Sequence, residues 1–228
     1  MSEKPSFMAG MGMGTEFPDT GGSQDDDQVR RFWMPRGGEK KIVFLTNADD
    51  APAIYEHQVK LGNGRGAFQN WFTCLESLGK GCPLCKWSDE NDEFRRSMVL
   101  FLTVIDVAGY TSKTTGKVYT DLKRLYAAKK GTAESLNRKV TKLIERDKPL
   151  RGAMFEVFRK NDDKSPGAGS DFDYVEHVDL DGFEDATEYD YAEILKPDPD
   201  KVAKCIKQLQ AERGAMETPP PNEDDIPF

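Results

Sequence analysis

The sequence predicts a mainly β protein with a few helices, and three observations lead to this fold class. Short apolar or alternating segments of strand length recur through the middle of the chain. One amphipathic helical segment interrupts them before the last two strands. Hydrophobic residues make up 37% of the 228 residues, and the segments with the most biased composition lie at the two ends. We therefore expect a β-rich core with unpacked ends.

The expected strands follow from two patterns. Lys40–Thr46 and Met98–Val107 are continuous apolar runs, which are typical of buried strands. Ala53–Leu61 alternates apolar and polar residues, and the glycine-rich turn at 62–66 joins it to Ala67–Thr73 as a hairpin. Further strands are expected at Lys117–Ala128, Ala153–Lys160 and Phe172–Leu180.

Three helices are expected. Ser88–Arg96 begins with a Ser that can cap a helix, carries acids in its first turn and ends in Arg. Thr132–Asp147 places apolar residues at i, i+4, i+7 and i+8 along one face. Asp200–Arg213 follows a proline-containing turn and forms the third helix.

Three cysteines and a histidine have the spacing of a metal site. Cys82 and Cys85 form a C-P-L-C turn that aims two sulfur atoms at one point. Seven residues separate Cys74 from Cys82, and 16 separate His57 from Cys74 across the proposed hairpin. Four such ligands predict one structural Zn²⁺ per chain. His57 is favoured as the fourth ligand because a hairpin brings its ends together, and the rivals are His177 and Cys205.

Short strands with one helix before the last two suit a small closed or partly open barrel. The sequence therefore predicts an OB-fold, a five-stranded Greek-key barrel, with a small zinc-binding subdomain. The expected organisation is a flexible acidic leader at 1–29, an OB-fold core at 30–195 with the zinc subdomain at about 55–90, a C-terminal helix at 196–213 and a disordered acidic tail at 214–228.

Charge is divided unevenly along the chain, whose net charge is −8. Residues 1–29 carry one Lys against six Asp/Glu, a net charge of −5. Residues 30–160 carry 25 Lys/Arg against 15 Asp/Glu, a net charge of +10, and residues 161–228 carry six against 19, a net charge of −13. A basic body between acidic ends is typical of a protein that binds a polyanion.

Aromatic residues lie among the cations of this basic body. Single-stranded nucleic acid is held by cations along its backbone and by aromatic rings that stack on its bases. We therefore expect a surface for single-stranded DNA, and no spacing in the sequence indicates a reader of duplex sequence. The expected DNA-binding residues are Arg30, Arg31, Phe32, Trp33, Arg36, Arg65, Phe68, Trp71, Lys117, Tyr119, Lys123, Arg124, Tyr126, Lys129 and Lys130.

Other classes of protein are not expected from this sequence. It shows no catalytic constellation and no glycine-rich phosphate loop, so an enzyme is not expected. No apolar run approaches the roughly 18–20 residues of a membrane span, and the N-terminus lacks the apolar region of a signal peptide. A soluble cytoplasmic protein without a membrane partner, with reduced cysteines, is the expectation.

Together these features resemble the single-stranded-DNA-binding (helix-destabilising) proteins of tailed bacteriophages. The resemblance covers roughly residues 30–180, and it rests on RFWMP, KKIVFLT, His57, Cys74, GCPLC at 81–85 and SMVLFLTVIDV. It implies a zinc-containing OB-fold that coats and protects single-stranded DNA, largely independently of sequence, in phage DNA replication, recombination and repair. It further implies the cytoplasm of an infected bacterium and self-association on DNA, although the leader here is acidic where the well-studied members have a basic arm.

The C-terminal tip, EDDIPF, resembles the acidic tip of bacterial single-stranded-DNA-binding proteins. That resemblance implies docking onto a replication or recombination protein, such as a polymerase, helicase loader, recombinase or nuclease. A partner with an apolar pocket beside a basic rim would take the ring and the carboxylate of the last residue together. The expected interaction residues are Asp224, Asp225, Ile226, Pro227 and Phe228.

Two other functions fit the same sequence. An RNA-binding or translational-control protein would use the same barrel, and a competition between DNA and RNA separates it from a DNA-binding protein. A zinc-ribbon adaptor would link subunits of a replication complex without touching nucleic acid, and its signature is a failure to bind oligo-dT.

Overall fold

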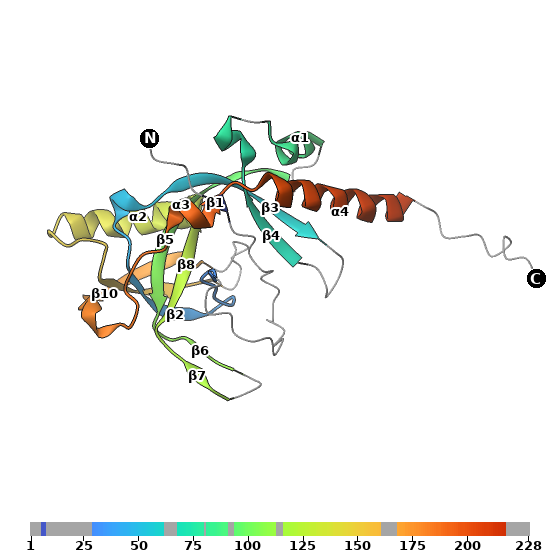
Figure 1. Cartoon of the computed structure of the whole chain (residues 1–228). Helices are drawn as coiled ribbons and strands as arrows, with labels where there is room; N and C mark the ends of the chain where they lie inside the picture. Colours follow the sequence, from blue (N-terminus) through green and yellow to red (C-terminus); the bar gives the residue numbers. More distant parts are fainter. Residues whose placement is uncertain are drawn as a thin grey trace, which may run out of the picture.

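The chain is built around an antiparallel β-sheet with helices packed beside it (Figure 1). The computed structural model describes residues 6–7, 29–61, 68–79, 81–90, 94–112, 116–160 and 168–217. In these ranges no helix has both the length and the apolar character needed to cross a membrane. Nearly all of the predicted leader, and residues 218–228 of the predicted tail, lie outside the described residues.

Seven strands in the described part of the chain form one sheet. They are β2 (Glu39–Phe44), β3 (Ala53–Leu61), β4 (Phe68–Thr73), β5 (Ser97–Asp106), β8 (Leu122–Lys129), β9 (Ala153–Phe158) and β10 (Asp171–His177). Every pairing is antiparallel, in the order β10–β9–β2–β5–β3–β4, and β8 also pairs with β5. The predicted class, mainly β with helices, is confirmed.

The strand β5 organises the sheet because three strands pair with it. β8 pairs along Val99–Asp106, β2 pairs with Val104–Asp106 and β3 pairs with Ser97–Leu100. β2 and β3 therefore share one edge of β5, at its opposite ends, and β8 takes the other edge. Among the described residues no pairing between β8 and β10 closes the sheet, so the predicted barrel closure is not found.

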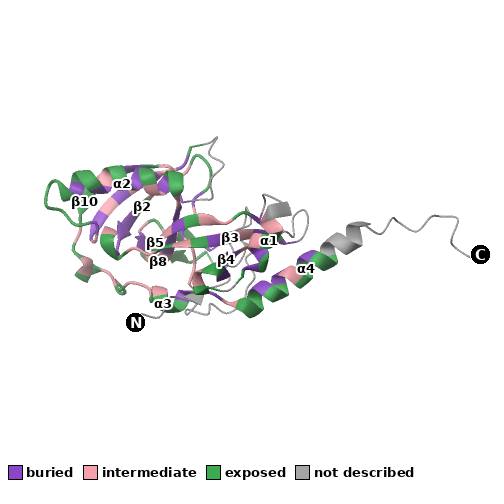
Figure 2. Cartoon of the chain, turned by 90° about the horizontal axis from the view of Figure 1, so that it is seen from above, coloured by how far each residue is buried: buried purple, intermediate pink, exposed green. Residues whose placement is uncertain are grey.

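The main core lies under helix α2 (Lys130–Ile144). α2 buries Leu136, Val140 and Leu143, which belong to the stripe that the sequence pattern predicts, and exposes its opposite side (Figure 2). These side chains meet a set of buried residues from the strands that includes Phe44, Leu102, Tyr126, Phe155 and Phe172. Full burial of one such side chain stabilises the fold by about 1.5–3 kcal/mol, so this core is the main source of stability.

The segment 178–196, which we call the acidic strap, packs against residues of the sheet that lie outside the main core. It contains a 3-10 turn (Leu180–Gly182), α3 (Tyr191–Ile194) and β11 (Leu195–Lys196), which pairs with β1 (Ser6–Phe7). Ile194 and Leu195 pack with Phe101. The Tyr191 hydroxyl lies 2.6 Å from Thr46 Oγ1 and 2.8 Å from Thr103 Oγ1. Apolar burial and these hydrogen bonds therefore fix the strap on the sheet.

A short hairpin projects from the end of β5 and β8 (Figure 1). Its strands are β6 (Tyr110–Thr111) and β7 (Val118–Tyr119). The continuous strand predicted at Lys117–Ala128 is wrong, because Asp121 has a φ of 54°. A residue in this left-handed region breaks an extended strand, so the chain turns between β7 and β8.

Two helices begin at prolines. α1 is Pro83–Glu90, five residues earlier than the predicted Ser88–Arg96. Pro83 stands at the first helical position, where a missing N–H breaks no hydrogen bond. α4 (Pro199–Glu217) lies close to the predicted Asp200–Arg213 and starts in the same way. The early start of α1 places Cys85 inside a helix.

Candidate metal centre and nucleic-acid interface

The four predicted metal ligands converge on one point. The ligand atoms of His57, Cys74, Cys82 and Cys85 all lie within 4.8 Å of one another. His57 Nε2 is 3.5 Å from both Cys82 Sγ and Cys85 Sγ, and Cys74 Sγ is 3.5 Å from Cys85 Sγ. A tetrahedral Zn²⁺, with bonds of about 2.3 Å to sulfur and about 2.0–2.1 Å to nitrogen, needs neighbouring ligands roughly 3.5–3.8 Å apart. The donor set and its spacing fit such an ion.

The hairpin of β3 and β4 brings the ligands together as the sequence predicts. His57 lies opposite Phe72 in this hairpin, and the Cys74 N–H donates to the Tyr55 carbonyl at 2.8 Å, just after β4 ends. Cys82 and Cys85 flank the start of α1, where the Cys85 N–H donates to the Cys82 carbonyl at 3.1 Å. One hairpin and one helical turn thus build the site. We call β3, β4, the 3-10 turn Leu75–Leu78 and α1 the metal lobe.

A hydrogen bond orients the histidine ring. His57 Nδ1 lies 2.7 Å from the Phe94 carbonyl oxygen, and both residues are buried. A carbonyl oxygen only accepts, so Nδ1 carries the proton and the Nε2 lone pair faces the sulfurs. An outer hydrogen bond of this kind fixes the ring of a metal-binding histidine. The arrangement therefore suits a cation before any cation binds.

The thiols are held in unequal states of protonation. Hydrogen bonding from Cys82, aided by Arg96, lowers the pKa of Cys74 to about 3. Sharing that hydrogen bond raises the pKa of Cys82, and burial raises the pKa of Cys85 to about 12. These shifts favour the charged form at Cys74 and the neutral form at Cys82 and Cys85.

Metal affinity should consequently rise steeply with pH. A thiol must lose its proton before it ligates a metal, and the raised pKa values of Cys82 and Cys85 keep both protons in place at neutral pH. Binding displaces two protons from the folded cluster, and three if the lobe unfolds without the ion, so the apparent Kd should fall at least about 100-fold for each pH unit gained. Competition against a chromophoric chelator between about pH 6 and about pH 8 measures this slope, and a Kd independent of pH would contradict it.

The metal lobe has a core of its own, and α4 completes it. Cys205, with Val202 and Leu209, packs from α4 against this core, which also contains Cys74, Cys82 and Leu84. Cys205 is buried but is not part of the converging group. The other rival ligand, His177, lies in β10 and is exposed. Neither rival belongs to the metal centre.

Three predicted DNA-binding aromatics are buried. Phe32 and Tyr126 belong to the main core, and Trp71 belongs to the core of the metal lobe. Their exposed fractions are 2%, 0% and 1%, so no base can reach the ring faces. The structure corrects the expectation for these three rings: they stabilise the fold.

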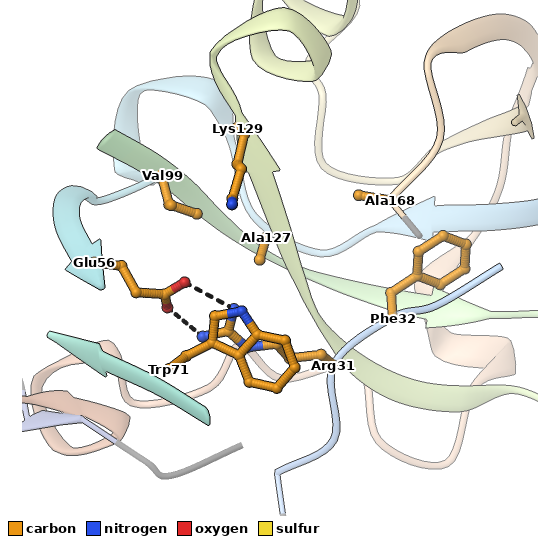
Figure 3. Close-up of a pocket in the computed structure, with 8 residues that line it drawn as sticks. All are labelled: Arg31, Phe32, Glu56, Trp71, Val99, Ala127, Lys129 and Ala168. Atoms are coloured by element: carbon orange, nitrogen blue, oxygen red, sulfur yellow. Dashed lines mark hydrogen bonds and ion pairs between the residues drawn. The ribbon is translucent and has the colours of Figure 1, made fainter. Parts of the chain in front are cut away.

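Arg31 lies at the junction of the main sheet and the metal lobe (Figure 3). Its guanidinium donates two hydrogen bonds to Glu56 and lies 4.5 Å from the centre of the Trp71 ring. The two charged side chains are 10% and 2% exposed. The adjoining cavity of about 20 Å³ has room for a water molecule but not for a base. Arg31 is therefore a structural cation in this conformation.

Three predicted lysines have partners. Lys123 pairs with Asp185 of the acidic strap at 2.5 Å and lies 4.8 Å from the centre of the Tyr189 ring. Lys129 donates to Gln58 Oε1 at 2.7 Å, and burial lowers its pKa. Lys130 is exposed at the start of α2, 4.0 Å from a Glu134 oxygen.

The remaining predicted residues differ in how far they can be placed. Trp33 is half-buried, and Arg36 is exposed in the turn before β2. Residue Arg65, the side chain of Phe68 and the tip residues Asp224, Asp225, Ile226, Pro227 and Phe228 lie outside the described residues.

Five residues gather where the β6–β7 hairpin leaves the sheet, and we call them the hairpin cluster: Arg30, Tyr110, Lys117, Tyr119 and Arg124. Tyr110 and Tyr119 stack with ring centres 5.1 Å apart and planes 15° apart. The Lys117 ammonium lies 4.8 Å from the centre of the Tyr119 ring. Burial, and next the neighbouring Arg30, lower the pKa of Arg124. The cluster thus combines cations with a stacked aromatic pair in which Tyr110 is exposed and Tyr119 is half-buried.

Neither arginine of the hairpin cluster forms an ion pair with a residue that the structure describes. Two half-buried cations that repel each other favour an anion between or beside them. Tyr110 is not among the residues predicted from the sequence. Its signal was the Thr/Gly-rich turn, since a hairpin there pairs Tyr110 with Tyr119.

Comparisons with known proteins add little to this site. No family model matches the chain. Over 87 residues it is 28% identical to the zeatin O-xylosyltransferase of Phaseolus vulgaris, a match that covers 36% of this chain. The chain spans 18% of the length of that protein, and so short a match at this identity does not show a family.

Proposed function

We propose that this protein binds single-stranded DNA, largely independently of sequence. The observation that supports this function best is the hairpin cluster, in which two half-buried arginines without ion-pair partners among the described residues adjoin a stacked tyrosine pair. Guanidinium groups bind phosphates, and exposed aromatic rings stack on bases whatever their identity. The net charge of +10 over residues 30–160 would attract a polyanion to this part of the chain.

The acidic strap disfavours the approach of DNA from the side of the sheet that it covers. It carries seven carboxylates over the sheet residues that it covers, and one of them, Asp185, already neutralises Lys123. Repulsion disfavours a polyanion on this side. The hairpin cluster therefore marks the end of the sheet at which we place the strand.

We propose further that the sheet is an OB-fold open between β8 and β10, and that the metal lobe holds one structural Zn²⁺; the antiparallel sheet and the converging His and Cys ligands support this. Four protein ligands leave no open coordination position, so the ion would hold the lobe together without serving as a catalyst. The proposed function is therefore binding, and it includes no enzymatic activity.

The biological setting is proposed from the sequence resemblance. It is replication, recombination and repair of phage DNA in the cytoplasm of an infected bacterium. The acidic tip would recruit a replication or recombination protein, and self-association on DNA belongs to the same proposal.

A binding titration with fluorescent oligo-dT tests the function. Arg124→Ala should weaken binding and lower the salt slope, because one phosphate contact contributes about 0.7 to it. Tyr119→Ala should cost about 1–3 kcal/mol through lost stacking. The matched control is Lys142→Ala, since Lys142 is an exposed cation on α2, away from the hairpin.

Three outcomes separate this function from its rivals. Tighter binding of an oligo-U competitor would assign the surface to RNA. A failure to bind either strand would favour an adaptor that contacts only protein. Equal affinity for duplex and single-stranded DNA would contradict the stacking mechanism, because duplex bases are not free to stack on tyrosine.

A further inference from the structure

A second exposed apolar surface lies at the other end of β5, beside the metal lobe. Tyr55 on β3 and Met98 on β5 stand directly opposite each other in the strand register. Their exposed fractions are 43% and 53%, although both lie in strands of the central sheet. Leu100, two residues along the same face, packs against the main core. The face of the sheet thus continues past the core with two large apolar side chains in solvent.

Arg96 adjoins this pair and links it to the metal centre. Its guanidinium carbon lies 4.6 Å from the centre of the Tyr55 ring. The same guanidinium donates to Cys74 Sγ at 3.6 Å and pairs with Glu76. Its side chain stays 37% exposed, so a ligand could reach the cation as well as the ring. The metal lobe therefore holds Arg96 beside Tyr55.

We propose that Tyr55 and Met98, with Arg96, form a second site for an unpaired nucleobase and its phosphate. This proposal rests on the proposed function. It adds a second contact site for DNA and a minimum length for a strand that reaches both sites. An exposed ring stacks on any base, a thioether packs against aromatic edges, and a guanidinium pairs with phosphate. A peptide would also bury apolar side chains here, but the exposed Tyr55 ring beside a partly exposed guanidinium favours a base together with a phosphate that shares Arg96 with Glu76.

The distance to the hairpin cluster makes the site testable by length. Asp106, which lies next to the hairpin, is eight residue steps along β5 from Met98, a distance of about 26 Å at about 3.3 Å per residue. Sites of about 4–16 nucleotides are usual for one OB-fold, so one strand from the upper part of that range could contact both ends. A strand of only three or four nucleotides could contact one end alone.

Photochemical crosslinking tests the proposal on the full, metal-bound chain. An oligo-dT of about 20 nucleotides that carries 5-iodouracil should form adducts at Tyr55 or Met98 as well as in the hairpin cluster. Tyr55→Ala should weaken binding of this strand about 5- to 150-fold and leave binding of a trinucleotide or tetranucleotide unchanged. Tyr55→Phe should keep the affinity, because it keeps the ring. The control is Ile144→Ala, which removes an apolar side chain that is 57% exposed on α2.

The outcomes distinguish this site from the proposed function. Adducts confined to the hairpin cluster, with normal affinity of Tyr55→Ala for the long strand, would overturn the second site and leave the proposed function standing. An unmodified protein that binds neither long nor short strands would overturn both. Adducts at Tyr55 or Met98 that Tyr55→Ala abolishes would establish the site.

Discussion

Removal of the metal should unfold the metal lobe and release α4. Cys74 and Cys82 are part of the lobe's core, so a bound ion and the packing would depend on each other. A structural Zn²⁺ contributes about 10–16 kcal/mol in small zinc domains at neutral pH, as much as the whole stability of many domains. α4 buries Val202, Cys205 and Leu209 against this core and should lose its docking surface with it.

Cys205 provides the measurement. It is 3% exposed, and peptide mapping after treatment with a maleimide distinguishes it from the three cluster cysteines. We expect Cys205 to be protected in the zinc-bound protein and modified rapidly after chelation. Cys82→Ser should behave like the chelated protein, whereas Cys205→Ser should keep one zinc per chain. A Cys205 that stays protected at zero zinc content would show that the lobe and α4 fold without the ion.

The metal centre could be predicted from sequence because its determinants are local. Cys82 and Cys85 need one turn of backbone, and His57 and Cys74 need one hairpin, so spacing alone brings the four together. The start of α1 could not be located from capping signals, because the C-P-L-C turn is itself the beginning of the helix. The convergence of these four residues is therefore predicted correctly although the predicted start of α1, the helix that contains Cys85, is wrong.

The nucleic-acid surface was harder to predict because an aromatic residue has the same character in a core and in an interface. Trp71 and Phe72 alternate along β4, yet both are buried in the core of the metal lobe, and the Trp71 ring also packs beside Arg31. Tyr119 shares its segment with Tyr126, but the break at Asp121 puts Tyr119 in the projecting hairpin and leaves Tyr126 in the core. Such differences depend on tertiary packing, which strand periodicity does not record.

Replacing Arg31 by Ala should destabilise the protein by about 3–5 kcal/mol. The variant leaves the Glu56 carboxylate buried, at 2% exposure, without its cation. It also removes the guanidinium from between the Trp71 and Phe101 rings, whose centres lie 4.5 and 5.5 Å from it. Urea unfolding followed by tryptophan fluorescence measures the change. The control is Arg36→Ala, which should change stability by less than about 0.5 kcal/mol because Arg36 is exposed.

A double variant separates the loss of a contact from the burial of a lone charge. Arg31→Met with Glu56→Leu removes both charges and keeps the volume, so it should recover most of the stability that Arg31→Ala loses. DNA binding then distinguishes a structural cation from a phosphate ligand. If Arg31 only joins the two parts of the fold, the folded double variant should bind oligo-dT with an unchanged salt slope. A slope lower by about 0.7 would instead mean that Arg31 leaves Glu56 to contact a phosphate when DNA binds, and the junction in Figure 3 would open with it.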